Sequence, residues 1–216
     1  MGGENLLIRA AREYGVTGVG ITLSREQAKE CQSRIQKENL QQQLKVLVMD
    51  YRDLAGSGLE FDRVASVGMI EHVGREHYGL FLSAVNAVLQ PGGLFLLHFI
   101  SSLKESAGDP WIRKYIFPGG MIPSLREIVH QCGEQSFHLL DAENLRRHYE
   151  KTLLWWHQNF LQARPAVETM FDQRFLRMWE LYLLSCAASF RNGELDLHQL
   201  LLIKGVNNSL PLTRPY

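Results

Sequence analysis

The sequence has 216 residues, 45% hydrophobic and 21% charged, which is typical of one soluble globular domain spanning residues 1–216. Lys plus Arg number 23 and Asp plus Glu number 23, so the formal charge is zero. This balance argues against the general phosphate-tracking surface of a nucleic-acid-binding protein, although it leaves room for a local basic patch, and we expect no nucleic-acid partner.

The cysteines, the apolar runs and the first residues indicate the cellular compartment of the protein. Cys31, Cys132 and Cys186 are far apart and form no CxxC pair, which favours a reducing compartment; no metal site is predicted. No apolar run approaches the roughly 18 residues of a membrane span. The first residues lack the basic and apolar regions of a secretory leader. We therefore expect a cytoplasmic protein, and any lipid contact must occur at a membrane surface; the family resemblance described below implies a location peripheral to the inner face of the membrane.

The first half of the chain alternates helical and strand patterns. Gly15 is a helix stop, and Ser24 with Gln27 has the spacing of a capping box. Strands are predicted at residues 16–23, 44–49, 61–67 and 94–100, with helices at 4–14, from 24 through 35, and at 76–89. This alternation is typical of βαβ units and predicts an α/β fold with a doubly wound, mostly parallel sheet.

The second half is richer in aromatic residues. Short helices are predicted at residues 109–115 and 124–132, with strands near 137–141 and 195–203. Between them, apolar residues recur at three- and four-residue spacing on two long helices. The first helix carries Leu145, Tyr149, Leu153, Trp156 and Phe160, and the second Phe171, Phe175, Met178, Tyr182, Cys186 and Phe190.

In sheets of this kind the ligand lies beyond the carboxyl ends of the strands. The residues at those ends are Thr22 and Leu23, Asp50 and Tyr51, 68–72, and 98–100. The usual opening of such a domain is a strand, a glycine-rich turn and a helix. Here Gly2 and Gly3 directly precede the first predicted helix and look like the tail of such a turn. We therefore expect a sheet that lacks its first strand.

An ordered series of motifs carries a resemblance to one family. The sequence resembles bacterial cyclopropane-fatty-acyl-phospholipid synthases and the related mycolic-acid cyclopropane synthases over nearly all of its length. The matching segments, in chain order, are 18–27 (GVGITLSREQ), 50–53 (DYRD), 61–63 (FDR), 66–74 (SVGMIEHVG), 96–98 (LLH), 109–112 (DPWI), 114–120 (KYIFPGG), 148–153 (HYEKTL), and 174–175 (RF) with Met178.

The resemblance implies a reaction and a catalytic site. S-adenosylmethionine (SAM) donates a one-carbon unit to a cis double bond in a phospholipid acyl chain, through a carbocation that a bound bicarbonate ion deprotonates. By motif, Glu71, His98, Tyr149 and the backbone of Ile100 hold that bicarbonate. The family's cysteine ligand belongs to a segment before Met1, and none of Cys31, Cys132 and Cys186 replaces it by motif.

The resemblance also implies a cofactor site and the fold around it. The fold is the class I SAM-dependent methyltransferase type, with a helical insertion that covers the substrate. Asp50, Tyr51 and Arg52 are expected near the adenine, and Gly2 and Gly3 near the methionine end. The remaining predicted cofactor residues are Thr22, Leu23, Gln27 and Val67.

Each of these residues also has an ordinary structural interpretation. Glu71 could be part of a surface pair with His72, His98 a satisfied core histidine, and Tyr149 part of an aromatic core face. Arg146, Arg147, Lys151 and Arg164 fit either anionic lipid headgroups or a solvated helix face. The alternative functions are a SAM methyltransferase acting on another lipid or a small molecule, and an inactive remnant. A homodimer is a further expected arrangement, because a missing strand exposes a sheet edge.

Overall fold

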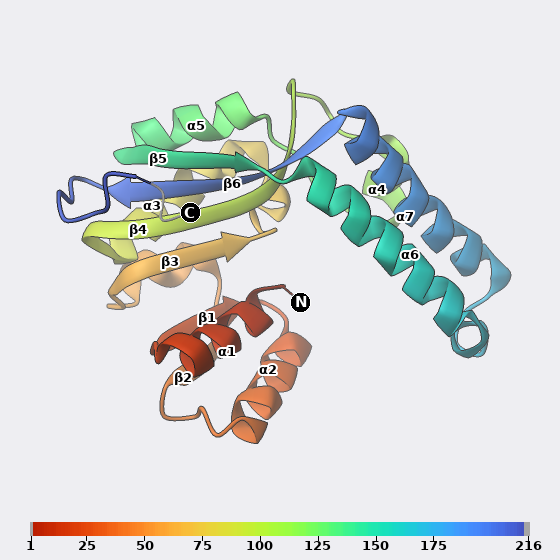
Figure 1. The fold of residues 1–216 in the computed structure, drawn as a ribbon, viewed down its shortest axis with the longest axis horizontal. Helices are drawn as coiled ribbons and strands as arrows, with labels where there is room; N and C mark the ends of the chain where they lie inside the picture. Colours follow the sequence, from red (N-terminus) through yellow and green to blue (C-terminus); the bar gives the residue numbers. More distant parts are fainter. Residues whose placement is uncertain (1, 214–216) are drawn as a thin grey trace.

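The computed structural model describes residues 2–213, with side chains from residue 5 onward. It has three parts: a small unit built on two strands, a larger unit built on four strands, and a helical hairpin that projects from the larger sheet (Figure 1). The α/β class predicted from the sequence is confirmed.

The small unit contains α1 (Gly2–Tyr14), β1 (Gly18–Thr22), α2 (Arg25–Lys37) and β2 (Leu44–Val48). β1 and β2 pair in parallel, with Gly18 opposite Leu44. A Cβ atom at Gly18 would lie 2.5 Å from a Leu7 methyl carbon, so glycine lets α1 pack closely on β1. The core between the helices and this sheet consists of Ile8, Ala11, Cys31, Ile35, Leu40 and Leu44.

The larger sheet has the strand order β3-β4-β6-β5. β3 (Phe61–Val67) is parallel to β4 (Leu89–Ser102), whereas β6 (Leu195–Lys204) is antiparallel to both β4 and β5 (Phe137–Asn144). The sheet is therefore mixed. Three short 3₁₀ helices, η1 (Tyr51–Gly56), η2 (Ile70–His72) and η3 (Arg75–His77), follow β2 and β3.

Two helices cover one face of the larger sheet. α3 (Tyr78–Val88) and α5 (Leu125–Glu134) contribute Phe81, Leu82 and Ile128, which are at most 2% exposed, to its main core. Along β4, alternate residues such as Leu97 and Phe99 are fully buried in this core, while the residues between them are only half-buried. This alternation, a consequence of the two-residue repeat of a strand, turns His98 and Ile100 towards the opposite face.

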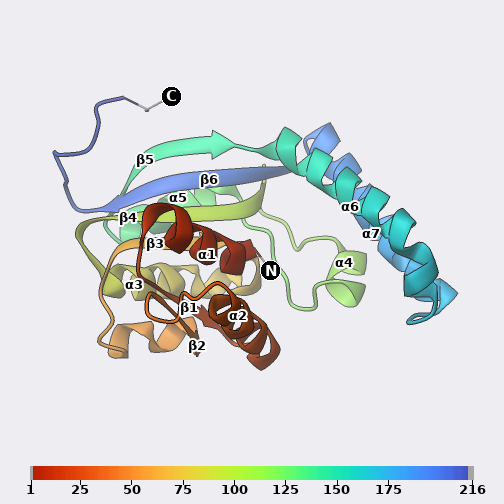
Figure 2. The same cartoon turned by 60° about the horizontal axis from the view of Figure 1, so that its bottom comes forward.

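The helical hairpin consists of α6 (Arg146–Glu168) and α7 (Gln173–Asn192), beside the short helix α4 (Pro110–Tyr115). Figure 2 shows the hairpin extending from the ends of β5 and β6. Its core includes Leu153, Leu176 and Phe190, each about 1% exposed, together with Leu197 of β6. This hairpin is the helical insertion expected from the sequence.

In the described part of the chain, β1 and β3 are not paired, and the two sheets are separate. Side chains join them instead. A cluster around Leu54, Ala84 and Val88 takes in Ile21 from β1 and Val64 from β3. The separation of the sheets agrees with the expectation that a strand between them is missing from this sequence.

Element boundaries differ from the predictions at a few places. α1 begins at Gly2, so Gly2 and Gly3 form a first helical turn rather than the tail of a loop. β4 begins at Leu89 and passes through the predicted Pro91–Gly93 turn, with Gly92 at φ +74° and irregular pairing to β3. β1 is half-buried rather than fully buried, because α1 and α2 pack mainly on one face of the small sheet.

Candidate functional site

Glu71 lies in η2, just beyond the carboxyl end of β3. Gly68 makes the turn possible with φ +63°, and its N–H donates to the His98 carbonyl at 2.9 Å. The Glu71 side chain is 9% exposed, and its Oε1 accepts a hydrogen bond of 2.8 Å from the backbone N–H of Ile100. Its Oε2 is buried and has no hydrogen-bond partner among the described residues. The Glu71 carbonyl accepts from the N–H of Met121, which fixes this turn.

Burial raises the pKa of Glu71, and the hydrogen bond from Ile100 only partly offsets that shift. A carboxyl group with a raised pKa and one free, buried oxygen is suited to exchange a proton or to hold a small polar ligand. Glu71 is therefore not the exposed surface residue of the ordinary interpretation.

Tyr149 approaches the same place from the first turns of α6. Its ring contacts Phe190 edge-on, with ring centroids 4.9 Å apart, and Trp156 at 6.0 Å. Burial raises the pKa of Tyr149, and the nearby charge of Glu71 raises it further. Tyr149 and Ile100 also pack against the same core cluster. The structure thus brings Glu71, Ile100 and Tyr149 together from three distant segments.

His98 lies two residues before Ile100 on the same face of β4, and it is paired with Gln199 of β6 and Val67 of β3. Burial lowers the pKa of His98, and a side-chain hydrogen bond with Gln199 works in the opposite direction. The imidazole is therefore neutral at pH 7. Its structural partner is Gln199, on the flank of the Glu71–Ile100 pair.

The first part of the predicted cofactor site lies after β1. Thr22 Oγ1 donates to the Gln27 side-chain oxygen at 2.9 Å and accepts from the N–H of Ser24 at 3.1 Å. Ser24 caps α2 as predicted, but the Gln27 side chain bonds Thr22 rather than closing a capping box. Leu23 is 71% exposed beside them. Parallel pairing brings this turn next to the end of β2, where the Met49 N–H donates to the Thr22 carbonyl at 3.1 Å.

The second part lies after β2. Asp50 caps η1 by accepting from the N–H of Arg52 and forms an ion pair of 2.5 Å with the Arg52 guanidinium. These two hydrogen bonds lower the pKa of Asp50. The Tyr51 ring packs edge-on against Phe81 of α3, with centroids 5.5 Å apart. The carboxylate at this strand end is therefore charged and held in a fixed position.

The remaining predicted cofactor residues lie at the edges of the two units. Val67 ends β3 and is 38% exposed, and the first turn of α1 contains Gly2 and Gly3.

Two residues of the predicted aromatic face on α7, Cys186 and Tyr182, also lie near Tyr149. The Cys186 thiol on α7 is close enough for its charge to affect the pKa of Tyr149, and burial raises the pKa of Cys186 to about 11. Burial likewise raises the pKa of Tyr182, which is one helical turn earlier on the same face. Their four-residue spacing on the predicted aromatic face was the available signal.

A third residue not predicted from the sequence is Tyr78, at the start of α3. Its side chain is 1% exposed, and its buried hydroxyl has no hydrogen-bond partner among the described residues. Burial raises its pKa to about 12, and Glu127, Arg75 and Glu71 are close enough to contribute. Tyr78 therefore lies in the polar surroundings of Glu71.

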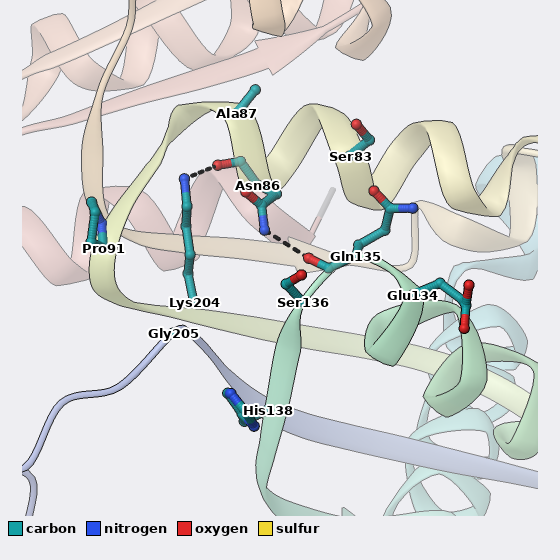
Figure 3. A pocket seen from close by; sticks show the side chains of 10 residues that line it. All are labelled: Ser83, Asn86, Ala87, Pro91, Glu134, Gln135, Ser136, His138, Lys204 and Gly205. Atoms are coloured by element: carbon teal, nitrogen blue, oxygen red, sulfur yellow. Dashed lines mark hydrogen bonds between the residues drawn. The ribbon is translucent and has the colours of Figure 1, made fainter.

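A separate cavity of about 580 Å³ lies at the other end of β4, near Pro91 (Figure 3). The Lys204 ammonium group in it donates to the carbonyls of Asn86 and Leu89 at 2.6 and 2.7 Å, closing the end of α3. Its charge thus has a structural role. In the described residues, no group of three or more His, Cys, Asp or Glu side chains could hold a metal ion.

Comparison with known proteins identifies the family. The model of the mycolic acid cyclopropane synthetase family matches residues 1–200. The chain belongs to this family. It is 42% identical over 205 residues to the cyclopropane-fatty-acyl-phospholipid synthase of Escherichia coli K12, covering 94% of this chain and 52% of that protein. It is 37% identical over 210 residues to the tuberculostearic acid methyltransferase UfaA1 of Mycobacterium tuberculosis, covering 94% and 48%.

Solved structures of the family confirm the fold. The cyclopropane synthase MmaA2 from Mycobacterium tuberculosis is 27% identical and superimposes with a TM-score of 0.84. The mycolic acid cyclopropane synthase CmaA1, complexed with SAH and CTAB, is 28% identical with the same TM-score. Each comparison covers 91% of this chain and 73% of the solved chain. The chain spans about half the length of the curated relatives that it matches.

Proposed function

We propose that this protein transfers a methylene unit from SAM to the cis double bond of an unsaturated phospholipid acyl chain, forming a cyclopropane ring. One observation carries the proposal. The Glu71 carboxyl group is buried, fixed through Oε1 by the Ile100 N–H, and left with an unpartnered Oε2. Burying a carboxyl oxygen without a hydrogen-bond partner destabilises the fold. Such groups are typical of active sites, where the desolvated and fixed carboxyl group takes part in catalysis.

The reaction requires a base next to an apolar chain. The π electrons of the alkene form a bond to the SAM methyl carbon, while the sulfur takes the electron pair of the broken C–S bond and leaves as S-adenosylhomocysteine. A base then takes a proton from the new methyl group, and the C–H electron pair closes the ring onto the carbocation. The carbocation formed on the acyl chain must meet no water or other nucleophile. Burial of Glu71 and Tyr149 supports such a dry site.

The residues present fit a bicarbonate ion. Bicarbonate both donates and accepts hydrogen bonds, and it supplies the base. Glu71 Oε2 and the Tyr149 hydroxyl would hold it, with the neutral His98 ring at the flank. The Ile100 N–H supports the ion through Glu71, because Glu71 already accepts its hydrogen bond.

Aromatic rings stabilise a cation through the negative faces of their π systems, without bonding to it. Trp111, Ile116 and Tyr149 pack around one core cluster, which supports an aromatic wall for the acyl chain. The proposed wall consists of Trp111, Tyr115, Phe117, Tyr149 and Trp156.

At the other end, Thr22, Leu23, Gln27, Asp50, Tyr51 and Arg52 would bind SAM, which supplies an electrophilic methyl group. Asp50 and Thr22 provide fixed hydrogen-bonding oxygens at adjoining strand ends. The first turn of α1 with Gly2 and Gly3, and Val67 of β3, would border the methionine end. The SAH complex of CmaA1 supports a nucleoside site in this fold.

A phospholipid substrate implies that the proposed reaction takes place at a membrane surface, and the proposal assigns it to the cytoplasmic face. No helix in the described residues is long and apolar enough to cross a bilayer. The name of the Escherichia coli relative supports peripheral contact with phospholipid.

A second candidate is transfer of a methyl group that leaves a branched chain instead of a ring. It is favoured by the names of two relatives, the UfaA1 methyltransferase and a probable fatty acid methyltransferase of Pseudomonas putida that is 38% identical. The same carbocation yields either product, depending on which proton it loses.

Mass spectrometry of phospholipids from bacteria that lack their own cyclopropane synthase and express this chain tests the proposal. We expect acyl chains heavier by one CH₂ that resist catalytic hydrogenation. Chains that gain CH₂ but still take up hydrogen would assign the branched product. Cells expressing Glu71→Gln provide the background, and lipids indistinguishable from that background would refute the activity.

A further inference from the structure

The α6–α7 hairpin ends in an exposed apolar tip. Met170 and Phe171, in the turn between the helices, are 71% and 45% exposed, and Leu161 on α6 is 42% exposed. Figures 1 and 2 both show this tip as the part of the molecule that projects farthest from the sheets on that side. Apolar side chains gathered at such a projection are typical of an interaction surface.

The hairpin is also positively charged, although the whole chain is neutral. Residues 146–192 contain seven Lys or Arg and four Asp or Glu. Two of these acids, Glu168 and Glu180, pair with Arg164, and Asp172 accepts from the Phe175 N–H as the cap of α7. In the described part of the chain, five basic residues of the hairpin have no ion pair: Arg147, Lys151, Arg174, Arg177 and Arg191.

A continuous series of ring contacts leads from the tip to the candidate catalytic residues. Along α7, each ring lies 4.1–6.1 Å from the next, and the series crosses to the loop after α4 at 5.8 Å. It ends at the neighbour of Glu71, again at 5.8 Å. The rings, in order, are Phe171, Phe175, Trp179, Tyr182, Phe117 and His72.

We infer that the tip of the α6–α7 hairpin docks on an anionic phospholipid surface, with Met170 and Phe171 entering the boundary of the acyl region and Arg174 and Arg177 among the headgroups. This inference rests on the proposed function, because an acyl chain must reach Glu71 from a bilayer. Apolar insertion combined with basic side chains is the general mode of peripheral membrane binding. The aromatic series, in which Tyr182 is buried, joins the tip to the surroundings of Glu71 through packed apolar rings.

Vesicle sedimentation without SAM tests the docking separately from the chemistry. We expect the chain to bind vesicles of unsaturated phosphatidylglycerol and to bind phosphatidylcholine vesicles at least about tenfold more weakly. Met170→Asp should weaken binding to phosphatidylglycerol about tenfold or more. The matched control is Val206→Asp, because Val206 is 73% exposed but lies outside the hairpin, and it should bind as the parent does.

Charge reversal tests the headgroup contact. Arg174→Glu combined with Arg177→Glu should abolish the preference for anionic vesicles, whereas Lys37→Glu with Lys45→Glu, outside the hairpin, should retain it. Equal binding by Met170→Asp and the parent would overturn the inference. So would a dimer in sedimentation velocity that Met170→Asp dissociates, because a second copy would then cover the tip. Failure of ring formation with intact vesicle binding would refute only the proposed chemistry.

Discussion

Glu71 and Asp50 are both carboxylates that follow a parallel strand, yet the two regions around them give them opposite properties. Glu71 follows β3 of the four-stranded sheet and is buried, and burial raises its pKa. Asp50 follows β2 of the two-stranded sheet, where hydrogen bonds from Arg52 lower its pKa. The same position in a βαβ unit therefore yields a proton-exchanging group or a fixed anion, depending on what covers it.

The coverage has a structural cause. The turn after β3 is enclosed by the loop that carries Met121 and by α6 with Tyr149. The Met121 N–H donates to the Glu71 carbonyl, and Tyr149 is close enough for the charge of Glu71 to raise its pKa. The end of β2 is less covered: the Asp50 side chain is 16% exposed, and Val48 beside it is 53% exposed. The larger unit thus supplies a dry reaction site, and the smaller unit supplies polar groups for a ligand.

Replacing the unpartnered oxygen of Glu71 should have the largest effect on activity. Glu71→Gln retains Oε1 for the Ile100 N–H and replaces Oε2 with an amide, so we expect kcat to fall by about 10²–10⁴-fold. SAM affinity, measured by calorimetry, should stay within about twofold. Glu76→Gln is the control, since its side chain is 73% exposed. A Glu71→Gln variant that turns over at the parent rate would remove Glu71 from the chemistry.

The second test concerns Tyr149, which comes from a different segment. Tyr149→Phe keeps the ring contacts with Phe190 and Trp156 and loses only the hydroxyl, so the fold should be unchanged. Loss of one donor to a bound anion predicts a fall in kcat of about 10²-fold. Added bicarbonate should restore part of the rate. Tyr14→Phe, at a 79% exposed position, should have no effect, and an equal loss there would contradict a specific role.

The third test concerns the smaller unit. Asp50→Asn removes the charge that pairs with Arg52, and we expect SAM to bind about tenfold more weakly while the rate at saturating SAM is retained. Asp62→Asn is the control, because Asp62 is 80% exposed and lies before the strand end. A fall in kcat with unchanged SAM affinity would assign Asp50 to the reaction site instead.

Much of this arrangement could be predicted from the sequence. The helix and strand order, the cap at Ser24, and the position of Glu71 follow from local patterns and from the rule for strand ends. The antiparallel pairing of β6 could not be predicted, because it depends on the hairpin that returns the chain beside β4. The proximity of Cys186 to Tyr149 likewise depends on how α7 packs on α6. The apolar patterns of the two helices do not specify that packing.

The smallest expected effect is on stability, and it has opposite signs in the two regions. The pKa of Glu71 is raised on folding, so its contribution to stability is present below the unfolded carboxyl pKa of about 4.3 and is lost as pH rises through the folded value. Glu71→Gln should therefore melt above the parent at pH 7, with a difference that shrinks towards pH 4.

The pKa of Asp50 is lowered, so the contribution of Asp50 to stability is present above the unfolded carboxyl pKa and is lost on acidification. Asp50→Asn should melt below the parent at pH 7 and approach it in acid. Thermal melting of both variants between pH 4 and 8 would measure this, and differences of the same sign would mean that the two carboxylates share one environment.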